Sequence, residues 1–115
     1  MNFSYLKQFK DMQMLYKYCE EADEFAVTKP DISAASARKA LEFIVKFIYT
    51  AKVSQIYKGM NLFDMINDYH FQDYVNDTVL MSTIHYIRKM GNVAAHTGGL
   101  KIDESLKVLE ELHFL

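Results

Sequence analysis

The chain has 115 residues, half of them apolar and 24% charged, which is the composition of one globular domain with a single core. Its formal charge of −2 excludes a surface that holds nucleic acid by net charge alone, although it allows a local basic stripe. The single Cys19 excludes an internal disulfide and is typical of a reducing compartment, so we expect a cytoplasmic protein with Cys19 buried as a small hydrophobe. We expect neither a signal peptide nor a membrane span, because the first residues lack a basic and an apolar region and no run approaches ~18 apolar residues.

Glycine and proline are sparse, with four and one residues, which favours long helices over a fold with many turns. Helical spacing of apolar residues predicts helices over 5–25, 33–52, 62–69, 77–96 and 103–115, and the pattern between 70 and 76 is indistinct. The fold prediction is an all-α, up–down bundle of four main helices with a short fifth, in a single domain over 1–115. The breaks are predicted at Thr28-Lys29-Pro30, Lys58-Gly59 and Thr97-Gly98-Gly99, and the helix caps at Asp31 or Ser33, Asn61, Asn76 or Asp77, and Asp103.

The inward faces follow from the same spacing. They are predicted to carry Leu6, Phe9, Met12, Leu15, Tyr16 and Cys19 in the first helix, Ala37, Leu41, Ile44, Ile48 and Ala51 in the second, Leu80, Ile84, Ile87, Gly91 and Ala95 in the fourth, and Leu106, Leu109, Leu112 and Phe114 in the last. A glycine inside a helix costs about 1 kcal/mol relative to alanine. Because Gly91, Ala94 and Ala95 are all small, we expect a neighbouring helix to approach closely there.

The stretch Arg88-Lys-Met-Gly-Asn-Val-Ala-Ala-His96 is the most informative part of the chain. It spaces Arg88, Asn92 and His96 four residues apart, which places them within roughly 80° of arc on a helix. His85 extends the same face one turn earlier. A guanidinium, an amide and an imidazole can hold a phosphate or carry out acid–base chemistry on it. In the alternative interpretation, Asn92 is simply exposed and His96 interacts with the carbonyls at the end of the helix.

Other chemistries have weaker support. The four histidines, His70, His85, His96 and His113, lack the spacing of zinc-ligand pairs, and the chain contains no phosphate loop and no nucleophile with a base at a useful spacing. We therefore expect no metal and no cofactor in this domain. The eight tyrosines predict some exposed aromatic surface, which is a plausible partner interface.

Several strings in chain order resemble an N-terminal helical domain found on R subunits of type I restriction enzymes, the subunits that carry the DNA motor. The specific string is Ile87-Arg88-Lys-Met-Gly91-Asn92-Val-Ala-Ala95-His96, which resembles the L-R-x-x-G-N-x-A-A-H of that family. The weaker strings are Asn2-Phe-Ser-Tyr-Leu6 (N-F-x-F-L), Arg38-Lys-Ala-Leu-Glu42 (R-x-x-x-E), Asn61-Leu-Phe-Asp-Met-Ile66 (L-x-D-L-I) and Asp103-Glu-Ser-Leu106 (E-A-L).

That domain is similar in turn to the HEPN superfamily of helical bundles, so the resemblance implies a HEPN-like fold. Active HEPN ribonucleases carry an R-N-x-x-x-H motif, often completed across a dimer. Alignment on Asn92 and His96 places Gly91 at the position of the catalytic arginine, and Arg88 lies one turn earlier. Because RNA cleavage needs a cation fixed at the scissile phosphate, this departure argues against ribonuclease activity.

The resemblance therefore predicts a non-catalytic accessory domain of a type I restriction R subunit, which contributes to assembly or to nucleic-acid or nucleotide binding. We expect Arg88, Asn92 and His96, with Arg38, Glu42 and His85, to form a polar network at a binding or dimer surface. An ion pair between Glu42 and Arg88 across helices is the purely structural version of this network. The partners implied are other restriction-enzyme subunits, nucleic acid or a second copy, and not a membrane.

The parent protein implied by the resemblance is an ATP-dependent endonuclease that uses ATP and Mg²⁺ outside this domain. Because the chain stops in mid-pattern at His113-Phe-Leu115, we expect it to be the front part of a longer polypeptide. The first alternative is a metal-independent HEPN-type ribonuclease or toxin, with His96 as the acid–base group and Arg88 as the phosphate anchor. The second alternative is a plain helical protein-interaction module.

Overall fold

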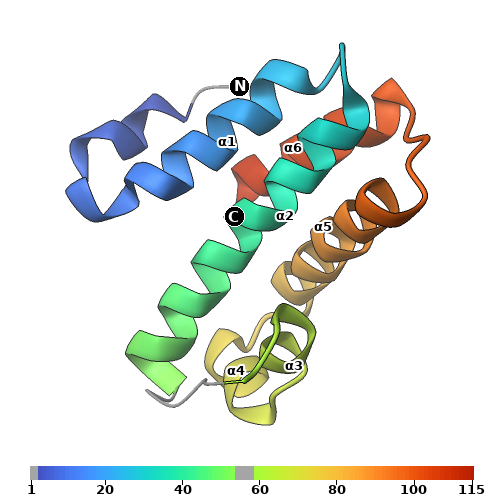
Figure 1. The fold of residues 1–115 in the computed structure, drawn as a ribbon. Helices are drawn as coiled ribbons and strands as arrows, with labels where there is room; N and C mark the ends of the chain where they lie inside the picture. Colours follow the sequence, from blue (N-terminus) through green and yellow to red (C-terminus); the bar gives the residue numbers. More distant parts are fainter. Residues whose placement is uncertain (1–2, 54–58) are drawn as a thin grey trace.

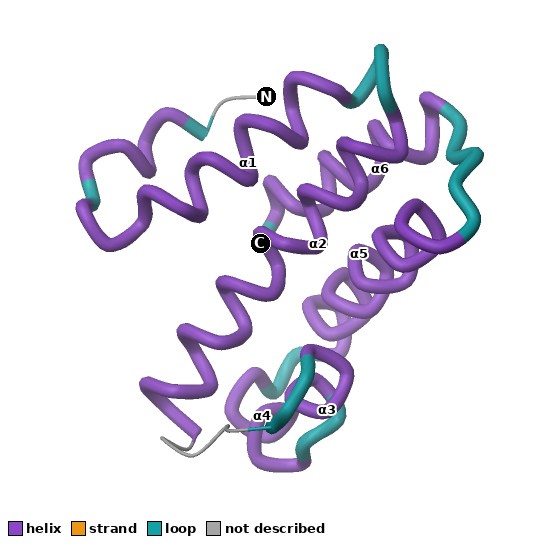
Figure 2. Tube along the Cα trace, in the orientation of Figure 1, coloured by secondary structure: helices purple, strands orange, loops and turns teal. Residues whose placement is uncertain are grey.

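The computed structural model describes residues 3–53 and 59–115, and within them it is all-α, with no β-strand. Figure 2 shows the helices joined by short loops. The α-helices are α1 (Gln13–Phe25), α2 (Pro30–Ile48), α3 (Leu62–Ile66), α4 (Tyr69–Val75), α5 (Thr78–His96) and α6 (Ile102–Phe114). Two 3₁₀ turns, η1 (Ser4–Gln8) and η2 (Lys10–Met12), precede α1, and a π-helical turn, η3 (Tyr49–Val53), continues α2.

The four long helices α1, α2, α5 and α6 alternate in direction, with α2 at the centre in contact with the other three (Figure 1). This arrangement confirms the predicted all-α up–down bundle of four main helices. The short helices α3 and α4 lie together at one end of the bundle, in the connection between α2 and α5. The sequence predicted one short helix there and missed α4, because Asp68 and Asn76, which bound it, are separated by only seven helical residues.

Two of the predicted helix caps are confirmed. Asn61 accepts a hydrogen bond from the backbone N–H of Asp64 at 2.8 Å, and Asp77 accepts one from Leu80 at 3.0 Å. The predicted stop after α5 is also confirmed, since Gly98 and Gly99 have φ of +70° and +80°. Gly59 stands in a turn with φ of +85°, whereas Lys58, the other half of that predicted turn signal, lies outside the described residues.

The other predicted caps are wrong. Helix α2 begins at Pro30, whose fixed φ suits the first helical position, so Asp31 and Ser33 lie inside the helix. Ser33 instead donates from its hydroxyl to the carbonyl of Ala22 at 2.5 Å and joins α2 to α1. Helix α6 begins at Ile102, before Asp103, and Glu104 accepts from the backbone N–H of Lys101 at 2.9 Å.

The N-terminal segment is not the single helix predicted over 5–25. The chain turns at Phe9, which has extended backbone (φ −106°, ψ 114°), and only α1 beyond it is a regular α-helix. Gln13 stabilises this turn by donating to the carbonyls of Lys7 and Phe9, both at 3.1 Å. The turn lets Phe3 and Leu6 fold back onto the core, while Phe9, predicted to be inward, is half exposed. Asn2, part of the resemblance to the restriction family, lies outside the described residues.

The core confirms the centre of each predicted inward face and corrects the ends. The fully buried side chains include Leu41, Val45, Leu62, Met65, Ile66, Phe71, Ile87 and Val108. Ala51, Ala95, Leu106 and Phe114 were predicted to face inward and are exposed. In α6 the buried face is carried by Ser105, Val108, Leu109 and Leu112, because the helix is rotated so that Leu106 and Phe114 lie at its solvent side. None of the helices in the described ranges combines the length and hydropathy that a membrane span needs.

Candidate functional site

The contact between α2 and α5, which we call the arginine seam, contains the predicted site residue Arg38, and Arg88 lies on α5 one turn before the point of contact at Gly91. The two helices run antiparallel (Figure 1), and Gly91 of α5 is buried against the side chain of Arg38 of α2. A Cβ atom on Gly91 would lie only 2.4 Å from Cβ of Arg38, closer than carbon atoms pack. The predicted close helix approach at Gly91 is therefore confirmed, and Arg38 is the residue that occupies the space left by the missing side chain.

The carboxylate of Asp31, which we call the Asp31 clamp, fixes how α2 and α5 are positioned along each other. Asp31, in the first turn of α2, accepts hydrogen bonds from the backbone N–H groups of Gly99 at 2.9 Å and Leu100 at 3.0 Å. The positive φ of Gly98 and Gly99 turns the chain after α5 so that these donors face Asp31. Because the two bonds tie the end of α5 to the start of α2, Arg38 is held opposite Gly91.

Both arginines of the seam have a buried N–H group that lacks a hydrogen-bond acceptor. Nε of Arg38 and Nε of Arg88 are inaccessible to solvent, and within residues 3–53 and 59–115 neither has a hydrogen-bond partner. The guanidinium carbon of Arg88 lies 5.1 Å from the ring centre of Phe63 in α3, a cation–π contact that holds the head group in place. Buried donors are almost always paired in folded proteins, so two unpaired guanidinium donors at one helix contact call for an acceptor.

Glu42 does not provide that acceptor. The ion pair predicted as the structural alternative, between Glu42 and Arg88, is not formed in the described structure. Glu42 instead pairs with Lys46, one turn later on α2, at 2.9 Å. Both side chains of that pair are partly exposed, so the pair contributes little to stability. Glu42 therefore does not neutralise the guanidinium charges of Arg38 and Arg88.

The remaining predicted residues continue from the seam along α5. His85, one turn before Arg88, is half-buried, and burial and then the Arg88 charge lower the pKa of its imidazole below the usual 6.5. Asn92 is half-buried and His96, the last residue of α5, is exposed. His96 stands in the last turn of α5, as the alternative interpretation had it, and among the described residues Thr97 Oγ1 and the Gly98 N–H donate to the Val93 carbonyl, at 3.1 and 2.8 Å.

The geometry of the seam suits an oxyanion with several oxygens, such as a phosphate. A guanidinium presents its donors in a planar fork that matches phosphate oxygens, so Arg38 or Arg88 can hold a phosphate through two parallel hydrogen bonds. Asn92 and His96 lie one and two turns after Arg88 on the same helix face and can contact the next part of a longer ligand. The structure thus places Arg38 at the contact with Gly91 and Arg88 one turn earlier on α5, with His85 and Asn92 on the adjoining turns. Glu42 pairs with Lys46, and His96 is exposed at the end of the helix.

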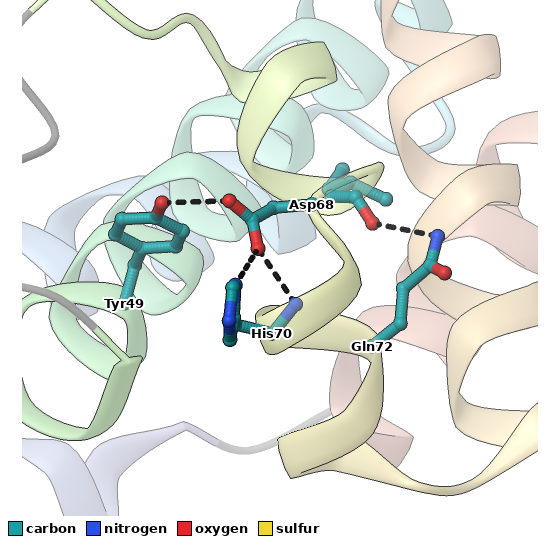
Figure 3. A network of polar contacts seen from close by, with 5 residues as sticks. Tyr49, Asp68, His70 and Gln72 are labelled. Carbon is teal, nitrogen blue, oxygen red and sulfur yellow. Dashed lines mark hydrogen bonds and ion pairs between the residues drawn. The ribbon is translucent and has the colours of Figure 1, made fainter.

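A second polar network was missed by the sequence analysis. The hydroxyl of Tyr49 donates to Asp68 Oδ2 at 2.9 Å, while Asp68 Oδ1 accepts from the backbone N–H of His70 at 2.7 Å and pairs with His70 Nδ1 at 3.3 Å (Figure 3). The Tyr49 hydroxyl lowers the pKa of Asp68, and burial, followed by Asp68, raises the pKa of Tyr49. This network caps α4 and joins it to the end of α2. An aspartate before the short apolar pattern that starts at Tyr69 was the available signal.

Two further groups bear on the chemistry of the chain. Cys19 is buried, as predicted, and burial raises the pKa of its thiol to about 12, so it is not a nucleophile at neutral pH. In the part of the chain that the structure describes, no three histidine, cysteine or carboxylate side chains come together as metal ligands. Comparison with protein-family models, with curated proteins and with solved structures finds no match to this chain.

Proposed function

We propose that this chain is a phosphate-binding accessory domain of a cytoplasmic DNA restriction system, of the kind that the type I R-subunit resemblance implies. It binds nucleic acid or a nucleotide at the arginine seam and does not itself cut. The observation that carries the proposal is the pair of buried, unpaired Nε donors of Arg38 and Arg88 on facing helices. Both side chains are partly exposed, and a phosphate oxygen is an acceptor that forms charge-assisted hydrogen bonds with a guanidinium.

The aromatic side chain beside the seam favours a nucleic acid over a free anion. Phe63 is 53% exposed and has Arg88 over its ring, so it can present a flat surface for a base next to a phosphate held by the guanidinium. The formal charge of −2 does not oppose this binding, because the contact is local and a few bound phosphates suffice.

Fluorescence anisotropy with short labelled single-stranded DNA and RNA tests the proposal. Affinity should fall as salt rises, and Arg38→Gln and Arg88→Gln should each weaken binding at least tenfold, on the order of the 1.5–3 kcal/mol of a charged hydrogen bond. Lys89→Gln is the matched control, because Lys89 is the exposed neighbour of Arg88 and its removal changes the net charge equally. An absence of binding at low salt, or an equal loss with Lys89→Gln, contradicts the proposal and favours the protein-interaction module.

One observation also favours the ribonuclease alternative. In the motif alignment Gly91 stands where the active enzymes have arginine, and the side chain of Arg38 from α2 covers that glycine. The neighbouring helix therefore supplies an arginine at position 91 of the motif, directly before Asn92 in the chain. The chemistry that this alternative needs is proton transfer by His96 with an arginine at the scissile phosphate.

Incubation of the purified protein with labelled RNA in the presence of a metal chelator separates the two functions. The accessory-domain proposal predicts RNA that is bound and stays intact. Cleavage by the wild type that is lost in both His96→Ala and Arg38→Gln, and kept in Lys89→Gln, would instead establish the ribonuclease.

A further inference from the structure

A groove opens on the other side of α5, where α6 packs against it. We call it the α5–α6 groove, and its volume is about 660 Å³. Each helix lines it with residues spaced three, four and seven apart, so that one face of α5 looks across at one face of α6. These residues are Val79, Ser82, Thr83 and Tyr86 of α5 and Lys107, Glu110, Glu111 and Phe114 of α6, with His113 at the side.

The groove has two aromatic or apolar ends and a polar middle. At one end Val79 and Phe114 are 65% and 63% exposed. At the other end the ammonium of Lys107 lies 5.1 Å from the ring centre of Tyr86. Between them the Thr83 hydroxyl donates to Glu111 Oε2 at 2.9 Å, and this bond joins the two helices at the bottom of the groove. The eight residues from Val79 to Tyr86 span about 10 Å along the helix axis, which is about two turns.

The surroundings of the groove are acidic. Glu110 and Glu111 line it together with Lys107, and Asp103 and Glu104 lie one to two turns earlier on α6, just after Lys101. The pKa of Tyr86 is raised by burial and further by the nearby carboxylates of Glu104, Glu111 and Asp103. A ligand for this groove is therefore expected to be basic.

We propose that the α5–α6 groove binds a basic amphipathic helix of another polypeptide. A helix is the shape that packs between two antiparallel helices, and apolar side chains two turns apart on it would contact the Val79–Phe114 end and the Tyr86 end. Lysine or arginine side chains between them would meet Glu110 and Glu111. A second copy of this chain is disfavoured, because its own groove would bring the same carboxylates against each other. The proposal is independent of phosphate binding at the arginine seam.

The test uses a labelled synthetic helix of about 18 residues, with leucines two turns apart and lysines between them. A charge-reversed peptide has glutamate at each lysine position and the same leucines. We expect the basic peptide to bind at least about tenfold more tightly than the charge-reversed one, by fluorescence anisotropy at low salt. Equal affinities, or no binding of either peptide, would overturn the proposal.

Variants of the protein locate the binding. Val79→Gln and Glu110→Lys should each weaken the basic peptide at least about fivefold. Val27→Gln and Glu24→Lys are the matched controls, since they make the same changes at exposed positions of the α1–α2 end. All four positions are exposed, so the variants should keep their far-UV circular dichroism and melting temperature. Equal losses in the control variants would also overturn the proposal.

Two outcomes point to a different occupant or a different site. A dimer in sedimentation velocity that Val79→Gln converts to monomer would assign the groove to a second copy and contradict the proposal. Loss of peptide binding in Arg38→Gln and Arg88→Gln, with retention in Val79→Gln, would move the peptide away from the groove and contradict it as well. Retained peptide binding in the two arginine variants supports peptide binding at the α5–α6 groove. Phosphate binding at the arginine seam is tested separately by the nucleic-acid assay.

Discussion

Helix α5 has two sides that differ in both packing and charge. Toward α2 it presents Gly91 and the backbones approach closely. Arg38 at this contact and Arg88, one turn earlier on α5, each have an unpaired Nε donor among the described residues. Toward α6 it presents Thr83 and Tyr86, and an open groove with carboxylates on the far wall remains between the helices. One helix thus separates a tight basic contact from an open acidic one.

The difference shows why the net charge of the chain is a poor guide to its partners. A formal charge of −2 predicts little preference between acidic and basic ligands. The two sides of α5 nevertheless favour ligands of opposite charge. Gly91 allows the close approach of α2 and α5, because the side chain of Arg38 occupies the space where a side chain at position 91 would lie. A larger residue at position 91 would push α2 away.

Replacing Gly91 with a larger residue should change the stability of the protein more than any other substitution at the two sides of α5. Gly91→Leu is expected to lower the free energy of unfolding by about 3 kcal/mol or more, because its Cβ would overlap Cβ of Arg38, which cannot rotate away. Gly91→Ala should lower it by about 1–2 kcal/mol, although alanine is the better helix former by about 1 kcal/mol. Urea unfolding followed by circular dichroism measures both.

The background Arg38→Ala serves as the control for that series. It removes Cγ and Cδ but keeps the Cβ that makes the closest contact, so it should relieve only part of the penalty at Gly91. Full recovery of stability in Arg38→Ala/Gly91→Ala would show that the flexible end of the side chain, and not the helix spacing, limits position 91.

Removing the Asp31 clamp should have the next largest effect. Asp31→Ala leaves the N–H groups of Gly99 and Leu100 without their acceptor, which should lower the free energy of unfolding by about 1–3 kcal/mol. Asp31→Asn keeps one acceptor oxygen and should lose about half as much. Hydrogen exchange tests whether the lost hydrogen bonds cause the change, since the Gly99 and Leu100 amides should exchange faster in the variant while core amides are less affected.

The pH dependence contributed by His85 should be the smallest of these effects. Its folded pKa is lowered, so the folded state favours the neutral imidazole, and the stability it contributes is complete above pH 6.5. As pH falls below 6.5 the unfolded chain takes up the proton first, and stability should decline toward the folded pKa. Melting temperatures between about pH 7 and 5.5 should therefore fall less in His85→Gln than in wild type.

The control for His85 is His96→Gln at the exposed end of the same helix. Its melting profile over that pH range should follow the wild type. A profile of His85→Gln that coincides with the wild type would show that burial beside Arg88 does not set the protonation of His85.

The local signals in the sequence located the long helices and several of their ends correctly. Asn61 and Asp77 are caps because their side chains reach backbone N–H groups three residues later, an interaction complete within one turn. Asp31 failed by the same criterion: its best donors come from Gly99 and Leu100, 68 and 69 residues away in the chain. Phe9 failed because burial of Phe3 and Leu6 outweighed helical spacing in the first segment.

The amino-acid sequence by itself determined the four long helices, the stop at Gly98 and Gly99, the small residue at position 91 and the polar spacing of Arg88, Asn92 and His96. Each of these depends on periodicity or on contacts within a few residues. Only the tertiary structure decided that Arg38 covers Gly91, that Glu42 pairs with Lys46 while Nε of Arg88 has no acceptor among the described residues, and that α5 and α6 leave an acidic groove. Those features depend on how helices far apart in the chain are rotated and spaced, and close packing settles that rotation for all of them together.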